Sequence, residues 1–294
     1  MTTVAVVGLG IMGAPMARNL LDAGFDVVGC NRSRAPVDAF VEAGGRGADD
    51  VASAVGTADV IITVLPDAPD VAEVTSGPDG ILAHCPRGAL HIDMSTIAPA
   101  AARELAEAAA EAGVRSLDAP VSGGDQGAAD GTLSIMVGGE AADVEEARPL
   151  FEAMGSTIEH VGPSGAGQTL KAANQLIVGG TIQLVAEAIV MLEASGVDPE
   201  AAVPVLAGGM AGNRILDRKA EGMLKRDFTP RFRVDLHHKD LGIVLDTARE
   251  AGATIPLGAA VAQLMGAARA RGDGQLDHTA LLRLVEELSG RSGE

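Results

Sequence analysis

The first half of the chain alternates short apolar runs with longer stretches whose apolar positions recur at helical spacing. Near-continuous apolar runs are typical of strands in a parallel sheet that is covered on both faces. Four such runs predict strands, namely Val4–Val7, Asp26–Cys30, Val60–Leu65 and Ala89–Met94. Helical patterns follow these runs, namely Ala14–Ala23, Ala35–Ala43, Val71–Thr75 and Ala98–Ala112. Strands that alternate with helices form right-handed βαβ units, so the pattern predicts an α/β fold with a doubly wound sheet.

The pattern changes at the glycine-rich residues 162–167. Before them, further segments can extend and cover the sheet, namely strands at Ser116–Asp118, Leu133–Val137 and Ile158–Val161 and a helix at Asp143–Met154. After them we find only helical patterns, with breaks at Gly196, Gly208, Gly209, Pro230, Gly252, Pro256 and Gly272. A helix that opens near Gly167 runs to about Ala194, beyond the usual length of a globular helix. We therefore expect a sheet domain over residues 1–163 and an all-helical domain over 164–294, joined through this helix.

Composition and charge exclude several classes of protein. Apolar residues make up 47% of the 294 positions, which argues against a disordered or fibrous chain. Five Phe, with no Tyr and no Trp, are too few for a platform that stacks single-stranded nucleic acid. A net charge of −18 leaves neither a basic footprint for DNA nor a polybasic run for a membrane surface. We expect a partner that is neither nucleic acid nor membrane.

The cysteines and the longest apolar stretch indicate the compartment. Cys30 and Cys85 are too few for a disulfide framework, and no Cys or His cluster has metal-ligand spacing. The N-terminal residues lack the charged region of a signal peptide. Leu176–Leu192 is interrupted by Gln183 and Glu187, so we do not expect it to span a membrane. A reducing cytoplasm is the expected location.

A glycine motif follows the first predicted strand directly and opens the first predicted helix. The run is Gly8-Leu9-Gly10-Ile11-Met12-Gly13, a G-x-G-x-x-G pattern in the context that its mechanism requires. Gly8 allows a tight turn, Gly10 lets the backbone approach a pyrophosphate, and Gly13 lets the helix pack on the strand. The helix N-terminus offers N–H groups and the positive end of its dipole. The motif predicts a Rossmann-type dinucleotide site, although a glycine turn without a ligand has the same pattern.

The residues at the end of the second strand favour NADP as the cofactor. An acidic residue is expected there for NAD, but the sequence has Asn31, Arg32 and Ser33. Arg32 can pair with the 2′-phosphate, while Asn31 and Ser33 can donate hydrogen bonds to it. NAD remains possible, because Arg32 can also be a solvated loop charge.

Two further loops lie at the carboxyl ends of predicted strands, where ligands bind in open α/β sheets. Leu65-Pro66 follows the third strand and Ser95-Thr96 follows the fourth. We expect Leu65, Pro66 and Thr96 to contact the ribose and nicotinamide. Pro66 can instead mark only the start of a helix.

Four segments resemble those of the β-hydroxyacid dehydrogenases, in the same order and over essentially the whole chain. Residues 8–20 resemble the family's opening signature, and Asp118–Gly124 resembles its substrate-binding segment. Gly165–Gln175 resembles the catalytic segment, and Lys239–Leu241 the third C-terminal motif. The resemblance implies an NAD(P)-dependent oxidoreductase with a sheet domain and a helical substrate and oligomerisation domain.

Some segments look like one branch of this family, the reductases of tartronate semialdehyde to glycerate. They are Asp130–Gly139, Gly208–Asn213 and Phe232–His237. The 3-hydroxyisobutyrate dehydrogenases resemble the last segment less well, but they and reductases of other small semialdehydes stay open. Imine reductases of this superfamily commonly replace the catalytic lysine, so Lys171 argues against an imine substrate. The 6-phosphogluconate dehydrogenases usually have a histidine three residues after their catalytic lysine. The corresponding lysine in this chain is Lys171, and Asn174 stands where that histidine would be, which argues against 6-phosphogluconate as the substrate. A non-catalytic nucleotide-binding module is the alternative from another functional class, but such a module would not need a catalytic lysine.

The resemblance makes Lys171 the general acid and base. A carbonyl that accepts hydride becomes an alkoxide, so a protonated group must meet its oxygen. Lys171 lies at the start of the long apolar helix, where desolvation would lower its pKa toward the working range. Asn174 lies on the same helix face, so it can orient the ammonium or hold a substrate hydroxyl. The other reading is that Lys171 only caps the loop before the helix.

The remaining site residues bind small anions. Ser122, Gly123 and Gly124 combine a hydroxyl with successive backbone N–H groups, which can surround a substrate carboxylate, although an ordinary turn has the same residues. By the resemblance, Lys239 lies near the cofactor or substrate, unless it is a surface charge. His237 and His238 point different ways on a helix and favour a core or solvated role. The apolar second half and the resemblance together imply a homodimer or homotetramer.

Overall fold

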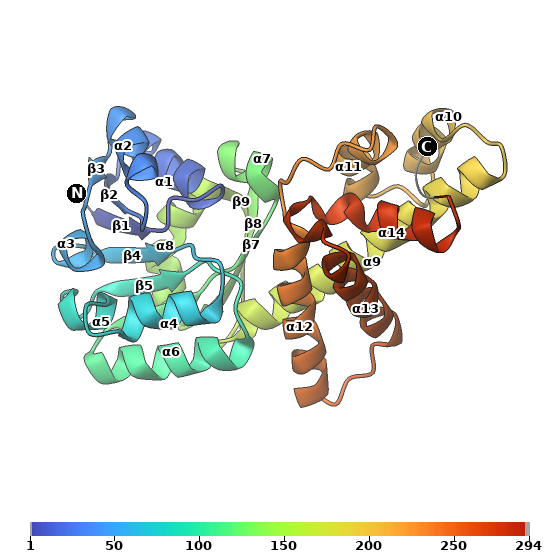
Figure 1. Ribbon diagram of the computed structural model, residues 1–294. Coiled ribbons are helices and arrows are strands. Elements are labelled where there is room, and N and C mark those ends of the chain that lie inside the picture. The colour runs from blue at the N-terminus through green and yellow to red at the C-terminus, as the bar shows by residue number, and fades with distance from the viewer. Residues whose placement is uncertain (1, 292–294) are drawn as a thin grey trace. The chain divides into compact units, whose positions relative to one another are not determined.

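The computed structural model describes residues 2–291 (Figure 1). By backbone contacts the chain divides into two units, one that ends at Lys171 and one that begins at Ala172. Unit 1 contains a sheet with covering helices, and unit 2 is helical.

Within residues 2–291, nine strands form one sheet in the order β3-β2-β1-β4-β5-β6-β8-β7, with β9 paired to β8. Their bounds are β1 Thr3–Val7, β2 Asp26–Cys30, β3 Arg46–Gly47, β4 Val60–Thr63, β5 Leu90–Asp93, β6 Arg115–Asp118, β7 Val121–Ser122, β8 Leu133–Gly139 and β9 Gly155–Gly162. Strands β1 to β6 are all parallel and have the 3-2-1-4-5-6 order of a dinucleotide-binding sheet. The switch point of this topology lies between β1 and β4.

Helices cover both faces of the sheet. They are α1 Gly13–Asp22, α2 Arg34–Glu42, α3 Val51–Val55, α4 Ala68–Ser76, α5 Ile81–His84, α6 Pro99–Ala112, α7 Gly124–Ala129 and α8 Ala141–Met154. From β1, Val4 and Val6 pack in one core with residues of α1 and α8. Ala5 and Val7 pack in another core with residues of α3 and α5. Successive side chains of a strand point to opposite faces, so burial on both faces leaves no polar alternation.

The predicted strands and helices of this half are present, with ends that differ by a few residues. The strand predicted to reach Leu65 ends at Thr63, because the chain leaves the ladder before Pro66. The helix predicted over Val71–Thr75 is longer in the structure. It begins at Ala68, where the Asp67 side chain caps α4 by accepting the N–H of Ala68. The short elements β3, α3, α5, β7 and α7 were not predicted, because they consist of few residues with little apolar patterning.

The direction of the sheet changes beyond β6. Strand β8 is antiparallel to β6, and β7 is antiparallel to β8, while β9 is parallel to β8. The doubly wound α/β prediction is confirmed, with this mixed extension added to the parallel part. In the sequence, β7 and α7 follow β6 directly.

Unit 2 is built from helices. Their bounds are α9 Ala166–Ala194, which begins in unit 1, α10 Pro199–Gly208, α11 Arg214–Leu224, α12 Val234–Glu250, α13 Pro256–Ala270 and α14 Leu281–Leu288, with 3-10 turns at Asp273–Gln275 and His278–Ala280. Over residues 172–291 the one β pairing is an isolated bridge between Arg233 and Asp277. The all-helical prediction for this half is confirmed. Helices α9, α10, α12 and α13 end within two residues of a predicted glycine, whereas α11 ends at Leu224, where no break was predicted.

Helix α9 is long and apolar enough, by length and composition alone, to cross a membrane. Core helices of soluble proteins pass the same test, and 44% of its most apolar window is buried inside the molecule. Its buried side chains include Gln175 and Gln183, and Gln175 donates to Asp240. Polar side chains with protein partners are typical of a helix packed in a protein core.

Candidate active site

The glycine loop after β1 is held close to β4 and to its own helix. Gly8 has φ +105°, and a Cβ there would lie 2.3 Å from the carbonyl oxygen of Val64. A Cβ on Gly13 would lie 1.9 Å from the carbonyl oxygen of Gly8. Both positions therefore require glycine, one for the turn and one for the entry into α1.

The outer side of the same loop is open. A Cβ on Gly10 would meet no atom within 4 Å, and the neighbouring Ile11 is 65% exposed. Helix α1 begins at this point, and in its first turn the N–H groups of Ala14 and Met16 donate to the carbonyl oxygens of Gly10 and Met12, while Pro15 has no N–H. Open space beside the glycine, at the positive end of the helix dipole, fits the pyrophosphate of a dinucleotide.

Asn31 joins the end of β2 to the glycine loop. Its side-chain oxygen accepts the N–H of Leu9 at 3.1 Å, and its side-chain nitrogen lies 2.9 Å from Ser33 Oγ. Arg32 is exposed and makes no ion pair with the part of the chain that the structure describes. The neighbouring Arg34, by contrast, is paired with Asp38 and Asp49. Arg32 is thus the guanidinium at this strand end that is not already held by carboxylates.

A buried polar network lies below the loops that follow β4 and β5. Asp93 Oδ1 accepts the hydroxyl of Thr63 at 2.7 Å and the N–H of Ser95 at 3.2 Å. Ser95 Oγ in turn accepts the N–H of Leu65 at 2.9 Å. The network fixes the two loops that carry the predicted cofactor contacts Leu65, Pro66 and Thr96.

His91 belongs to this network and is neutral. Its Nε2 lies 3.0 Å from Thr63 Oγ1, and because this hydroxyl donates to Asp93, the ring must donate to the hydroxyl. Burial lowers the pKa of His91, although the nearby Asp93 carboxylate opposes this. We did not predict Thr63, His91 or Asp93 as site residues. The available signal was their polarity near the ends of otherwise apolar strands.

The first turn of α9 is bound to the rim of the sheet in unit 1. Asp118, at the carboxyl end of β6, accepts the N–H groups of Gly165 at 2.7 Å and Gln168 at 2.9 Å. The Gln168 amide donates to the carbonyl of Ser95 at 2.8 Å and accepts the N–H of Ile97 at 3.2 Å. Sequence reasoning included Asp118 and Gln168 in motifs without giving either one a role.

Lys171 is buried one turn further along α9. Its Nζ donates to the carbonyl oxygen of Val121 at 2.7 Å. Val121 is the residue before Ser122, so the ammonium lies beside the segment predicted to bind a substrate carboxylate. Both groups belong to unit 1.

The Ser122–Gly124 segment connects β7 to α7. Gly123 and Gly124 have φ of +151° and +68°, and a Cβ on Gly124 would meet no atom within 4 Å. Ser122 is half-buried. This backbone geometry favours glycine at both positions and leaves space beside Gly124.

The remaining predicted residues lie in unit 2, where one hydrogen-bonded chain connects them. Asn174 donates to Gln175 Oε1 at 2.9 Å, and Gln175 donates to Asp240 Oδ2 at 2.5 Å. Lys239 Nζ lies 3.0 Å from Asp240 Oδ1. Gln175 and Asp240 were not predicted as site residues, and only their places in motifs pointed to them.

His237 is a core residue, as predicted. It is fully buried, and its Nδ1 lies 2.9 Å from Nδ1 of His278. Burial lowers the pKa of His278, which keeps that ring neutral. Among residues 2–291, no group of three or more His, Cys, Asp or Glu side chains could hold a metal ion.

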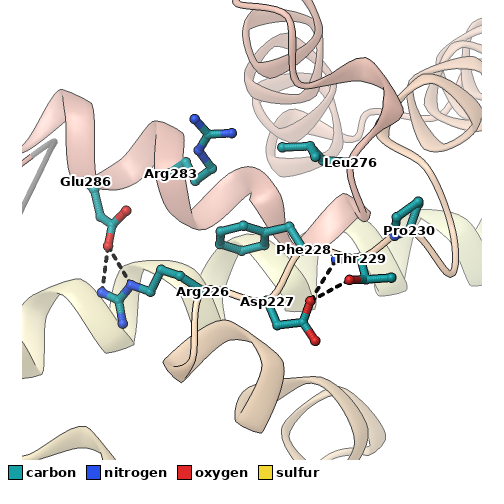
Figure 2. Close-up of a pocket in the computed structure, with 8 residues that line it drawn as sticks. All are labelled: Arg226, Asp227, Phe228, Thr229, Pro230, Leu276, Arg283 and Glu286. Carbon is teal, nitrogen blue, oxygen red and sulfur yellow. Dashed lines mark hydrogen bonds and ion pairs between the residues drawn. The ribbon is translucent and has the colours of Figure 1, made fainter.

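A shallow hollow of about 600 Å³ lies wholly within unit 2 and contains none of the predicted site residues. Figure 2 shows its side chains, with Arg226 directed at Glu286 and Asp227 bonded to Thr229. Of its charged side chains, Arg226 is paired with Glu286, and Arg283 is paired with Asp273, which does not line the hollow. This hollow offers no converging set of groups for catalysis.

Comparisons with known proteins cover both units. Residues 3–162 match the model of the NAD-binding domain of 6-phosphogluconate dehydrogenase. Residues 165–285 match that of the NAD-binding domain of NADP-dependent 3-hydroxyisobutyrate dehydrogenase.

Relatives align over nearly the whole chain. A 2-hydroxy-3-oxopropionate reductase of Escherichia coli (strain K12) is 41% identical over 95% of this chain and 96% of its own length. An NAD-dependent L-serine dehydrogenase of Pseudomonas aeruginosa is 38% identical over 99% of this chain and 100% of its own. The solved structure of Mycobacterium tuberculosis 3-hydroxyisobutyrate dehydrogenase with L-serine is 36% identical and has a TM-score of 0.86, covering 97% of this chain and 99% of that one.

Proposed function

Because the chain belongs to the 3-hydroxyisobutyrate dehydrogenase-like family of NAD(P)-dependent β-hydroxyacid dehydrogenases, we propose that it reduces tartronate semialdehyde to glycerate with NADPH. The observation that carries this proposal is Lys171, a buried ammonium held at the carbonyl before Ser122-Gly123-Gly124. A proton donor beside a carboxylate-binding segment suits a short semialdehyde that bears a carboxylate.

Lys171 is the general acid of the proposed reduction. A bound nicotinamide cofactor supplies hydride to the carbonyl carbon when the substrate is reduced. Lys171 Nζ gives its proton to the carbonyl oxygen and takes one back in the oxidation of the alcohol. Val121 holds the ammonium ready for this transfer, because its carbonyl oxygen accepts one of the three N–H groups.

The substrate carboxylate binds at Ser122, Gly123 and Gly124 in this proposal. A hydroxyl and backbone N–H groups surround an anion without adding positive charge. The space beside Gly124 supports this assignment, since no side chain fills it. Asn174 lies three residues after Lys171 on α9 and holds the substrate hydroxyl or orients the ammonium.

The cofactor binds along the rim of the sheet at the β1–β4 switch point. The loop Gly8–Gly13 holds the pyrophosphate, and the contacts to the ribose and nicotinamide come from Leu65, Pro66 and Thr96, with Lys239 as a further cation. Arg32, with Ser33 beside it, favours NADP over NAD, while Asn31 contributes to cofactor binding by supporting the glycine loop. The exposed, carboxylate-free guanidinium of Arg32 supports this preference.

A second candidate is 3-hydroxyisobutyrate dehydrogenase activity. It is favoured by the match of residues 165–285 to that enzyme's domain and by the structural similarity to the Mycobacterium tuberculosis protein. The named relatives act on different small substrates, so the test compares them directly. Purified protein is assayed for NADPH oxidation with tartronate, methylmalonate and succinate semialdehydes, and for NAD(P) reduction with 3-hydroxyisobutyrate and L-serine.

We expect the highest kcat/KM with tartronate semialdehyde. The variant Lys171→Met should lose at least about a thousandfold in kcat, because the alkoxide then lacks its proton donor. Lys225→Met is the matched control, since Lys225 is an exposed lysine paired with Glu221. Turnover by Lys171→Met at the rate of Lys225→Met would contradict the role of Lys171.

We further propose that the protein is a homodimer or homotetramer in which α9 contributes an interface. Leu170, Ile177, Leu184 and Met191 recur every seven residues and are 39%, 67%, 65% and 63% exposed. An exposed apolar stripe of this spacing suits a helix from a second copy. Light scattering should show a smaller assembly for Leu184→Glu, whereas the exposed Leu288→Glu on α14 should leave the mass unchanged.

A further inference from the structure

The carboxylate of Asp118 caps a helix that lies far from it in the sequence. Its two oxygens accept the N–H groups of Gly165 and Gln168, at 2.7 and 2.9 Å, across 47 and 50 residues. Asp118 is 4% exposed, so these bonds are shielded from bulk solvent. A carboxylate at this place satisfies donors of the first turn of α9 and meets the positive end of the helix dipole.

Two glycines let the helix come this close. A Cβ on Gly138, in β8, would lie 2.5 Å from Asp118 Oδ1. A Cβ on Gly167, in α9, would lie 2.3 Å from the carbonyl oxygen of Met136 and 2.9 Å from Asp118 Oδ2. Any larger residue at either position would push the helix away from the carboxylate.

Residues 118–121, which run from the end of β6 to the start of β7, bind α9 a second time, at Lys171. Asp118 and Val121 are three residues apart, and so are Gln168 and Lys171. The carboxylate of Asp118 holds the backbone of Gln168, while the carbonyl of Val121 holds Nζ of Lys171. These two attachments fix the position of the helix along the segment and therefore the position of the ammonium.

The charge state of Asp118 supports this arrangement. Burial raises its pKa to about 6, with a smaller contribution from the Asp93 carboxylate, while the N–H bonds from Gly165 and Gln168 lower it. The group is therefore ionised at neutral pH, and both oxygens are acceptors.

We propose that Asp118 is a positioning residue that holds Lys171 in register through the first turn of α9. Asp118 itself lies against the helix backbone, where it accepts the N–H groups of Gly165 and Gln168. This inference rests on the proposed role of Lys171, but the attachment of the helix can be measured without turnover.

The test compares wild-type protein with Asp118→Asn, which keeps the size of the side chain but places an amide against two N–H donors. Asp198→Asn is the control, because Asp198 caps the first turn of α10 through the N–H of Glu200 at 2.9 Å. Hydrogen exchange of residues 165–171 is measured in the cofactor-free proteins. Reductive methylation of Lys171 is followed by mass spectrometry, which is straightforward in a chain with four lysines.

We expect exchange in 165–171 and methylation of Lys171 to rise at least about tenfold in Asp118→Asn and to stay unchanged in Asp198→Asn. We also expect kcat to fall about tenfold or more, since small misplacement of a reacting group is costly, while the KM for NADPH stays within about twofold. Gly167→Ala, which keeps the Asp118 side chain but places a methyl group between it and the helix, should show the same pattern.

Unchanged exchange and labelling would overturn the proposal. So would faster exchange with wild-type kcat, because Asp118 would then serve the fold alone. If Asp118→Asn does not fold, Gly167→Ala decides between these results. If wild-type protein turns over none of the semialdehydes, the proposed function fails, and exchange and labelling still decide whether Asp118 positions Lys171.

Discussion

The side-chain oxygen of Asn31 accepts the backbone N–H of Leu9 at 3.1 Å, which ties the end of β2 to the glycine loop after β1. The side-chain nitrogen of Asn31 is engaged as well, with Ser33 Oγ 2.9 Å away. Asn31 therefore supports the loop from within the protein, while Arg32 extends into solvent beside it. The two neighbours should contribute to cofactor binding in different ways.

Replacing Asn31 should weaken the binding of NADPH and of NADH by the same factor. In Asn31→Ala the Leu9 N–H loses its acceptor and the loop loses one of its attachments, which costs about 1.4 kcal/mol, or about tenfold in Kd. Titration calorimetry with NADPH and NADH should show the same factor for each. A loss confined to NADPH would mean that Asn31 contacts the 2′-phosphate directly.

Replacing Arg32 should instead change the preference between cofactors. Arg32→Asp removes the partner of a 2′-phosphate and repels it, so the ratio of kcat/KM for NADPH to that for NADH should fall at least about a hundredfold. Arg34→Gln is the control, because Arg34 is already held by Asp38 and Asp49. An equal ratio in wild type and Arg32→Asp would refute the NADP assignment.

Gly10 and Gly13 should respond to alanine in opposite ways. A Cβ at Gly10 meets nothing in the protein, so Gly10→Ala should fold with a wild-type melting temperature but bind NADPH at least about tenfold more weakly. A Cβ at Gly13 would lie 1.9 Å from the Gly8 carbonyl oxygen, so Gly13→Ala should be strongly destabilised. Thermal melts of the cofactor-free proteins, followed by binding titrations, separate the two effects. Normal NADPH affinity in Gly10→Ala would place the pyrophosphate elsewhere.

Asp118 should make stability depend on pH. Its pKa is raised from the ordinary 3.8 to about 6 in the folded protein, so folding favours the protonated carboxyl. The stabilisation that this provides is complete below about pH 4 and is lost as the pH rises through 6. At pH 8 the buried carboxylate costs about 3 kcal/mol relative to pH 4.

The free energy of unfolding in urea, wild type minus Asp118→Asn, should therefore decrease by about that amount from pH 4 to pH 8. Taking the difference between the two proteins removes the other titrating groups. A difference that increases with pH would show that Asp118 has a lowered pKa in the fold.

The parallel part of the sheet could be predicted from the sequence because burial on both faces leaves a direct signal. Strand Asp26–Cys30 was predicted with the bounds that it has, since every residue after Asp26 is buried. The glycine motif was recognisable for a similar reason, because the positive φ of Gly8 and the close approach at Gly13 each exclude a side chain.

The polar network at the rim could not be predicted, because it depends on pairs that are distant in the sequence. Asp118 and Gln168 are 50 residues apart, and neither residue type nor spacing indicates that one caps the helix of the other. The reversal at β8 was missed as well, since an apolar strand looks the same in either direction. His91 was read as part of an apolar run, although its ring bonds to Thr63.

The division of the chain between Lys171 and Ala172 falls inside the continuous helix α9, not in a loop. The α-helix turns about 100° per residue, so inserting two residues at this point would swing Asn174 by about 200° relative to Lys171 and shift it by about 3 Å. A chimera that joins unit 1 to unit 2 of a relative would therefore have to preserve the helical phase to keep both residues on one face. Exchange of one unit for that of a relative is therefore limited by the residue count within α9. A flexible linker between the units would not impose this constraint.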